Sequence, residues 1–303
     1  MIKSVTITNY IGDSLKLELS DPWETGVAIQ DITGLGPVKA NMNFTKLVTS
    51  DGGLFNSARL NNRNIVFKFR VFGGRSCSVE DSRMILYNLF IVKKQVRLIF
   101  ETDNRHVYID GYVESNQPVI FSNKETLQVS VICPDPFFKS MTPFHAVFHG
   151  VEPAFEFEFS NESLEEPQML MSEIRNSTFR NIYYEGDEET GMKITLDLTG
   201  DIKDFILYNI GTNEKIALND NALEHIVGSR FIAGDTVILS TVNKKKGLKL
   251  IRGSREYNIL NILDKNVDWL KLRAGNNIFA YTVSEGNEHV HISIDNDILY
   301  AGI

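Results

Sequence analysis

Two glycine-rich stretches are the first candidates for chemistry in this sequence, because such loops are able to hold a phosphate group. They read GLGPVKA at residues 34–40 and DGGLFNSARLNNRN at residues 51–64. A phosphate-binding loop needs G-x-x-x-x-G-K-[ST] between a strand and a helix, and a dinucleotide site needs G-x-G-x-x-G in a similar context. Neither spacing is present, and no helical pattern follows either stretch. We therefore interpret the glycines as residues of tight turns.

Histidines and cysteines are the next candidates, as ligands for a metal ion. His289 and His291 in the stretch HVH share one face of an expected strand, but a zinc site needs three or four ligands. A polar outer strand face is the favoured interpretation. Cys77 and Cys133 form no C-x-x-C pair and are too few for a disulfide framework, so we expect two structural thiols made in a reducing cytoplasm. The sequence predicts no metal and no cofactor.

Paired carboxylates would be needed for hydrolysis of a glycosidic bond, and the second half of the chain is rich in them. Glu165 with Glu166, the run Asp187 to Glu189, and Asp295 with Asp297 are the examples. A glycosidase needs two carboxylates that converge in a cleft, and adjacency in a turn does not show convergence. Runs of like charge usually mark solvated faces. No catalytic constellation emerges, so we expect a protein that is not an enzyme, with a glycosidase as a remote alternative.

Trp269, in the stretch DWLKLRAGNNIFAY, is the candidate carbohydrate contact, because lectins stack sugars on exposed aromatic rings. Its apolar neighbours fit a core hairpin equally well, and large aromatic side chains are mostly buried on average. Core packing is favoured, and a carbohydrate-binding adhesin module stays open as the alternative function.

Composition and charge restrict the remaining classes. The chain has 303 residues, with 43% hydrophobic and 23% charged residues, which is typical of a folded protein of two domains. The net charge of -8 divides unevenly: residues 1–140 carry 16 basic against 14 acidic side chains, and residues 141–303 carry 15 against 25. The acidic second half argues against a nucleic-acid ligand. The sequence has neither a signal-peptide pattern nor an apolar run long enough for a membrane span.

Alternation of apolar and polar residues predicts a mainly β fold with two domains. NIVFKFRVF, ETLQVSVIC, KITLDL and HVHISI each place apolar side chains on one strand face, which is typical of antiparallel sheets. One helix is predicted over residues 78–94, with Ser78 as its N-cap. The prolines of CPDPFFKS at residues 133–140 predict a stiff boundary. We expect a domain at 1–140, β-sandwich-like with one helix, and a β-sandwich at 141–303 whose best helical candidate is ALEHIVGSRF.

Three stretches of the first half together resemble the distal tail protein family of tailed bacteriophages. IQDITGLGPVKA is similar to the family pattern I-x-x-I-x-G-L-G-P-x-K-A, and DGGLFNSARLNNRNI is similar to D-G-x-x-F-N-S-x-R-x-x-x-R-N-I. CPDPFFKS stands where the family ends its first domain. In the second half, GMKITLDLTG, GDTVILST, GLKLIRGSREYNILNIL and the final YAGI extend the resemblance over essentially the whole chain.

The resemblance implies a structural protein of a phage tail or prophage-like tail. Its first domain would form a homohexameric ring around a channel, and its second would be a galectin-like, jelly-roll-type β-sandwich at the periphery. The expected partners are the tail tube protein, the tip or hub protein, and either a receptor-binding protein or a host surface glycan. DNA would pass through the channel only in transit. The protein would be made in the cytoplasm of the bacterial host and would end in the virion, at the tail tip or baseplate.

The family also uses an extended arm or hairpin that reaches the neighbouring subunit, and residues 46–64 are the candidate here. Its polarity fits a segment whose hydrogen-bonding groups are met by another chain. We expect Arg59 and Arg63 to be interface donors, Phe55 an apolar anchor, and Asn56 and Asn64 amides that fix the loop.

Overall fold

The computed structural model describes residues 1–46, 51–153, 172–176, 178–264 and 267–303. The chain divides into unit 1, Met1–Thr142 with Leu299–Ile303, and unit 2, Pro143–Ile298. The break lies close to the expected boundary after residue 140. The expectation that the second domain extends to residue 303 was wrong, because the final segment pairs with a strand of unit 1. Glu165 and Glu166 lie outside the described residues.

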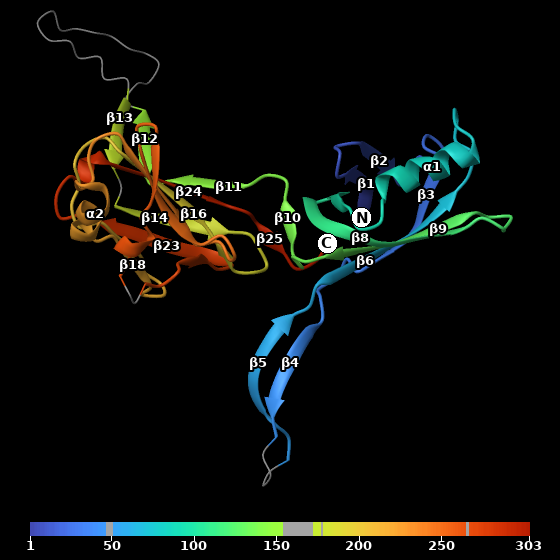
Figure 1. Ribbon diagram of the computed structural model, residues 1–303, viewed down its shortest axis with the longest axis horizontal. Coiled ribbons are helices and arrows are strands. Elements are labelled where there is room, and N and C mark those ends of the chain that lie inside the picture. Colours follow the sequence, from blue (N-terminus) through green and yellow to red (C-terminus); the bar gives the residue numbers. More distant parts are fainter. Residues whose placement is uncertain (47–50, 154–171, 177, 265–266) are drawn as a thin grey trace, which may run out of the picture. The chain divides into compact units, whose positions relative to one another are not determined.

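Unit 1 is built from antiparallel strands and one helix (Figure 1). In the main sheet the strands follow the order β2-β1-β7-β8-β9-β6-β3, and β10 joins β8 and β25. The elements are β1 (Ile2–Asn9), β2 (Ser14–Glu18), β3 (Val27–Thr33), β4 (Ala40–Thr45), β5 (Leu54–Leu60), β6 (Arg63–Val71), α1 (Val79–Leu89), β7 (Gln95–Thr102), β8 (His106–Val119), β9 (Thr126–Cys133), β10 (Phe138–Ser140) and β25 (Leu299–Tyr300).

The core of unit 1 lies between the main sheet and helix α1. In β6, Phe67 and Phe69 are fully buried while Lys68 and Arg70 on the opposite face are exposed, so the two-residue period read from the sequence is confirmed. The Phe67 ring lies 6.0 Å from that of Phe90, which directly follows the helix. Aromatic pairs at this separation add to the stabilisation from burial.

Helix α1 begins where the sequence predicts and ends earlier. Ser78 accepts a hydrogen bond from the backbone N–H of Asp81, and the Asp81 carboxylate accepts one from the backbone N–H of Ser78, which is a capping box. The predicted end at residue 94 was wrong. The backbone N–H of Lys93 donates to the carbonyl of Val113, and the N–H of Val113 donates to Lys94. Pairing with β8 therefore takes this segment out of the helix.

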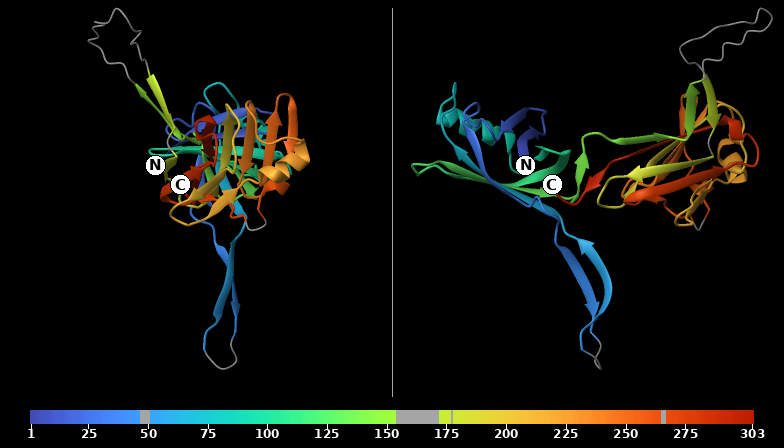
Figure 2. Two further views of the ribbon diagram at one scale, coloured as in Figure 1. Left: turned by 90° about the vertical axis from the view of Figure 1, so that its left-hand side faces the viewer. Right: turned by 180° about the vertical axis from the view of Figure 1, so that it is seen from behind.

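Strands β4 and β5 form a hairpin of their own, which Figure 2 shows from two sides extending away from the main sheet. Their register runs from Ala40 opposite Leu60 to Thr45 opposite Leu54. None of their side chains is buried, whereas the strands on either side in sequence, β3 and β6, belong to the main sheet. We call this hairpin, residues 40–60, the arm.

Unit 2 has two larger sheets, ordered β11-β24-β16-β19-β20-β21 and β14-β23-β17-β18. Side chains of both sheets share one buried cluster, as in a sandwich. The elements are β11 (Phe144–Val147), β12 (His149–Pro153), β13 (Ser172–Asn176), β14 (Phe179–Tyr184), β15 (Thr190–Gly191), β16 (Lys193–Leu198), β17 (Ile206–Asn209), β18 (Lys215–Ala217), α2 (Asp220–Val227), β19 (Asp235–Ser240), β20 (Gly247–Arg252), β21 (Arg255–Asn258), η1 (Leu260–Ile262), β22 (Lys271–Leu272), β23 (Gly275–Thr282), η2 (Asn287–His289) and β24 (Val290–Asn296).

The mainly β class is therefore confirmed, and the galectin-like type of the second domain stays a prediction. The short helix α2 overlaps the stretch ALEHIVGSRF, with Asn219 as N-cap and Gly228 as a left-handed C-cap. Within the described residues, no helix has the length and apolar character needed to cross a membrane.

Candidate functional site: the arm and its base

The arm has one apolar face and one polar face. Cross-strand partners share a face, and the register pairs Met42 with Ala58 and Phe44 with Phe55. Between these two pairs the register shifts, because β5 holds Asn56 as an extra residue. This bulge keeps Phe55 on the apolar face, where its ring lies 6.0 Å from that of Phe44.

Hydrogen-bonding side chains occupy the opposite face of the arm. The Asn43 amide donates to Ser57 at 3.0 Å, and the Asn56 amide donates to Thr45 at 2.6 Å. Arg59 stands opposite Asn41, near the base, and is exposed. The arm is therefore amphipathic, with a polar face that is already partly satisfied.

The apolar face has no core beneath it. Met42, Phe44 and Phe55 expose between 55% and 58% of their surface. A two-stranded hairpin alone in water is marginally stable at best, and contiguous exposed apolar surface marks an interaction site. The arm thus has the composition of a segment that packs against another molecule.

The residues expected at a subunit interface separate into two groups. Phe55, Asn56 and Arg59 lie in the arm, whereas Arg63 and Asn64 lie at the start of β6 in the main sheet. Asn64 accepts a hydrogen bond from Ser130 at 2.9 Å. The expectation that Arg63 is an interface donor was wrong, because its side chain is only 1% exposed and is bonded within the chain.

Arg63 lies at the base of the arm inside a cage of carbonyl oxygens. Its Nε donates to Pro136 at 2.6 Å, one terminal nitrogen donates to Gly34 at 2.5 Å and to Gly36 at 2.7 Å, and the other donates to Ala301 at 2.7 Å. The guanidinium also lies 4.5 Å from the centre of the Phe138 ring.

Burial has opposite effects on the two ionisable groups in this cage. It lowers the pKa of the Arg63 guanidinium, because the charged form loses hydration. It raises the pKa of the nearby Cys133 thiol to about 12, against the opposing effect of Arg63. The cage therefore holds a guanidinium cation beside a neutral thiol.

The first strand of the arm was missed by reasoning from the sequence, which placed the arm at residues 46–64. The sequence signal for this strand is the stretch ANMNFT at residues 40–45, in which apolar and polar residues alternate. Residues 47–50 of the expected arm lie outside the described residues.

Trp269 does not present an open ring in unit 2. It is partly buried and packs against the core cluster, and the amino group of Lys246 lies 4.8 Å from the ring centre. A sugar that stacked on that face would have to displace a cation from it. Core packing, the favoured interpretation, agrees with this placement.

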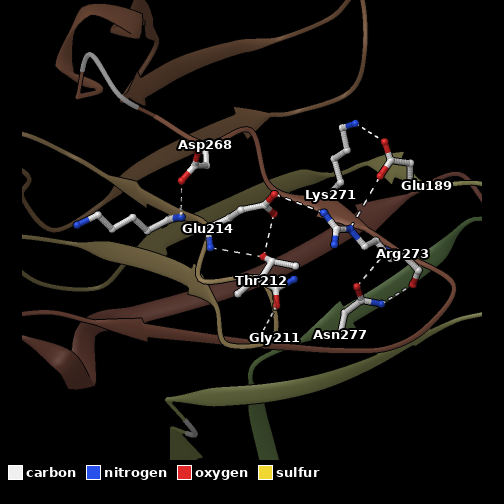
Figure 3. A network of polar contacts seen from close by, with 10 residues as sticks. Glu189, Gly211, Thr212, Glu214, Asp268, Lys271, Arg273 and Asn277 are labelled. Carbon is white, nitrogen blue, oxygen red and sulfur yellow. Dashed lines mark hydrogen bonds and ion pairs between the residues drawn. The ribbon is translucent and has the colours of Figure 1, made fainter. Parts of the chain in front are cut away.

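The polar side chains that follow Trp269 in the sequence are paired within a network of unit 2, which Figure 3 shows. Arg273 lies between two carboxylates, 3.9 Å from Glu189 and 3.5 Å from Glu214, and Lys271 pairs with Glu189 as well. The Asn277 amide exchanges hydrogen bonds with the Arg273 backbone at 2.7 and 3.0 Å. This network ties the turn before β18 to strands β22 and β23, so it has a structural explanation.

The other candidate groups also remain apart or paired. The expectation that His289 and His291 share a strand face was wrong, because His289 belongs to η2. Asp295 accepts a hydrogen bond from His145 at 2.6 Å. In the described part of the chain, no group of three or more histidine, cysteine, aspartate or glutamate side chains is arranged to hold a metal ion.

Comparison with known proteins identifies the fold. The crystal structure of the SPP1 Dit protein, gp 19.1, matches 97% of this chain and 98% of its own with a TM-score of 0.61. This chain has the fold of a Dit protein. The sequence identity is 14%, so the likeness concerns the fold alone, and at that level it confirms the resemblance seen in the sequence. The Dit structure is described as a paradigm of the hub adsorption apparatus in phages that infect Gram-positive bacteria.

Two structures of the phage P2 baseplate in its activated conformation, with Ca and with Sr, match at lower similarity. Their TM-scores are 0.44 and 0.42, both at 12% identity, over 98% and 97% of this chain and the same shares of theirs. No family model matches the sequence, and no curated protein matches it.

Proposed function

We propose that this protein is a structural ring component of a phage tail. Six copies would form a hub that joins the tail tube to the tail tip or baseplate, with the second unit as an anchor for receptor-binding proteins. The Dit-like fold over the whole chain supports this role. The product would be located in the virion, after synthesis in the cytoplasm of the host.

The observation that carries the proposal is the uncovered apolar face of the arm. A ring of identical subunits needs a heterologous interface, in which one patch of each subunit meets a different patch of the next. An arm that extends from its own sheet, with Phe44 and Phe55 exposed together, is suited to supply the first patch. Phe55 then acts as the apolar anchor and Arg59 as a donor at the edge of the contact.

The oligomeric state of the purified protein tests the proposal. We expect light scattering after gel filtration, or native mass spectrometry, to show a hexamer, and negative-stain images to show rings. Phe44→Ser with Phe55→Ser, which we call the arm-face variant, should give a folded monomer. The matched control is Asn43→Ala with Ser57→Ala on the polar face, which should still assemble. A wild-type protein that stays monomeric with its tube partner present would refute the ring.

A carbohydrate-binding adhesin remains the second candidate, and one observation favours a different location for its site. Phe179 and Tyr183 on β14 are 62% and 60% exposed, and Ile278 on the paired strand β23 is 39% exposed. The amides of Asn181 and Asn276 bond to each other on the same face. If this face binds sugar, glycan binding should be lost in Tyr183→Ala and kept in Trp269→Ala.

A further inference from the structure

Both connections of the arm to the main sheet meet at Arg63. The outgoing chain leaves β3 after Thr33 and enters the arm at Ala40, and the returning chain leaves the arm at Leu60. Arg63 is the first residue of β6 after that return. Its hydrogen bonds to the carbonyls of Gly34 and Gly36 therefore link the outgoing connection directly to the returning one.

The outgoing connection is also pressed against the returning strand. Gly34 has φ +88°, and a Cβ atom on it would lie 2.0 Å from the carbonyl oxygen of Asn64. Only glycine fits this position, on grounds of both conformation and space. The two connections therefore touch backbone to backbone.

Residues 299–303 complete the cage from the side of β10. Tyr300 pairs with Phe138 across the β25–β10 ladder, which anchors the segment on unit 1. Arg105 donates to the carbonyl of Gly302 at 2.8 Å and lies 4.2 Å from the centre of the Tyr300 ring. Ala301, between these two contacts, then presents its carbonyl to Arg63.

This segment also reaches the outgoing connection of the arm. The backbone N–H of Ile303 donates to the carbonyl of Leu35 at 3.2 Å. A Cβ atom on Gly302 would lie 3.1 Å from the same oxygen, so the two backbones pack closely. The connection that leads into the arm is therefore held on one side by Arg63 and on the other by residues 299–303.

We propose that Arg63 is a positioning residue that fixes the direction in which the arm leaves unit 1, and that residues 299–303 are a strap that holds its cage closed. The planar guanidinium fixes its donors in one geometry, so carbonyls bonded to it cannot turn independently. A buried guanidinium that lost an acceptor would be left unsatisfied, which disfavours any swing of the connection. The six residues of β4 span about 20 Å, so a small rotation at the base moves the tip several ångströms.

The idea rests on the proposed ring for its biological use, but the direction of the arm is measurable without a ring. Spin labels at Ser57→Cys on the arm and Gln128→Cys on β9 report the distance between arm and sheet. Cys77→Ser removes the accessible native thiol, and the arm-face variant keeps the protein monomeric. In the protein that carries the two labels, Cys77→Ser and the arm-face substitutions, we expect a narrow distribution of the distance between the labels.

Two substitutions should open the cage by different routes. Arg63→Lys keeps the charge and removes the planar set of donors, and Arg105→Ala loosens the strap without touching Arg63. Each should at least double the width of the distance distribution in a protein that still unfolds cooperatively. When Phe44 and Phe55 are restored, each substitution should raise the protein concentration needed for ring assembly at least tenfold. The matched control is Arg97→Lys, which alters an arginine paired with Asp110 and stacked on Tyr108 in the main sheet.

Each outcome decides the proposal. Broadening in both variants with an unchanged Arg97→Lys control supports it, even if no ring ever forms. If Arg63→Lys does not fold, the distribution in Arg105→Ala decides alone. A folded Arg105→Ala protein with the same narrow distribution as its parent would overturn the strap, and the same result in Arg63→Lys would overturn the positioning role.

Discussion

At the scale of single residues, Arg59 and Arg63 show how position overrides residue type. Both are arginines in a polar stretch, four residues apart, and both were expected at an interface. Arg59 is exposed on the arm, whereas Arg63 is buried and bonded to four carbonyl oxygens of its own chain. The two arginines differ in environment although they are only four residues apart, because β5 ends between them and the chain returns to the main sheet.

The two cysteines provide a test of burial at the same scale. Cys77 is partly exposed beside Ser82, whereas Cys133 is fully buried and its pKa is raised to about 12. At pH 8 the thiol of Cys133 is therefore protonated and unreactive, since the thiolate is the nucleophile. We expect iodoacetamide to modify Cys77 in the native protein and Cys133 only in denaturant, as read by peptide mass spectrometry. Equal rates of modification in the native state would contradict this burial.

The buried carboxyl group of Asp220 should make the stability of the protein decrease as the pH rises. Burial raises the pKa of this carboxyl group, and one oxygen accepts a hydrogen bond from the Asp204 backbone at 2.8 Å while the other is buried without a partner. The pKa of this carboxyl group is higher in the folded protein than in the unfolded protein. The free energy of unfolding therefore falls as the pH rises from the unfolded pKa through the folded pKa.

The variant Asp220→Asn removes this titration. The free energy of unfolding of the variant minus that of the wild type should therefore increase between pH 4 and pH 7, by about 1.4 kcal/mol for each unit of raised pKa. Urea unfolding at several pH values measures the difference. A difference that is flat or falls with pH would refute the raised pKa.

At the scale of elements, the arm depends on the bulge at Asn56 and on Gly34, where the chain leaves β3. The extra residue Asn56 lets Phe55 share a face with Phe44, so the apolar face exists only because β4 and β5 are paired in this register. Gly34 makes the exit from β3 compatible with the close approach to Asn64. The glycine-rich stretch GLGPVKA, at residues 34–40, therefore attaches the arm to the main sheet.

The two glycines of GLG should differ sharply when replaced. Gly34→Ala forces a strained φ and a clash with the Asn64 backbone, so we expect a loss of stability of about 1–3 kcal/mol. Gly36→Ala is the matched control, since a Cβ atom there meets nothing within 4 Å. Chemical denaturation of both variants makes the comparison. Equal stabilities of the two would show that the base of the arm is not tightly packed.

At the scale of the whole molecule, unit 2 is an insertion between two paired strands of unit 1. Strand β10 leads into unit 2, and β25, which pairs with β10, follows it. Residues 141–142 and 299–303 carry no charged side chain, so the charge division read from the sequence applies to the two units unchanged. Unit 2 therefore carries the acidic excess of the chain.

The buried cluster of unit 2 is formed by residues of that unit alone, which predicts that it folds in isolation. A protein of residues 143–298 should show a β-type circular dichroism spectrum and a cooperative thermal transition. Leu207→Asp, at a fully buried position, should abolish both. An isolated unit 2 without a cooperative transition would show that it depends on unit 1.

The sequence by itself determined the mainly β class and the position of the helix cap, and it predicted a boundary near the first of the two breaks between the units. These follow from local patterns: strand alternation has a period of two, a cap depends on residues three apart, and paired prolines stiffen one segment. The resemblance to distal tail proteins was also readable, because its motifs are short and continuous.

Only the tertiary structure decided which polar residues are interface and which are interior. The cage around Arg63 joins residues 34, 36, 63, 136 and 301, and no local pattern encodes contacts over such separations. The membership of residues 299–303 in unit 1 was hidden for the same reason. A carbonyl cage has no signature in residue type, since every residue carries a carbonyl, and only the path of the backbone brings those oxygens together.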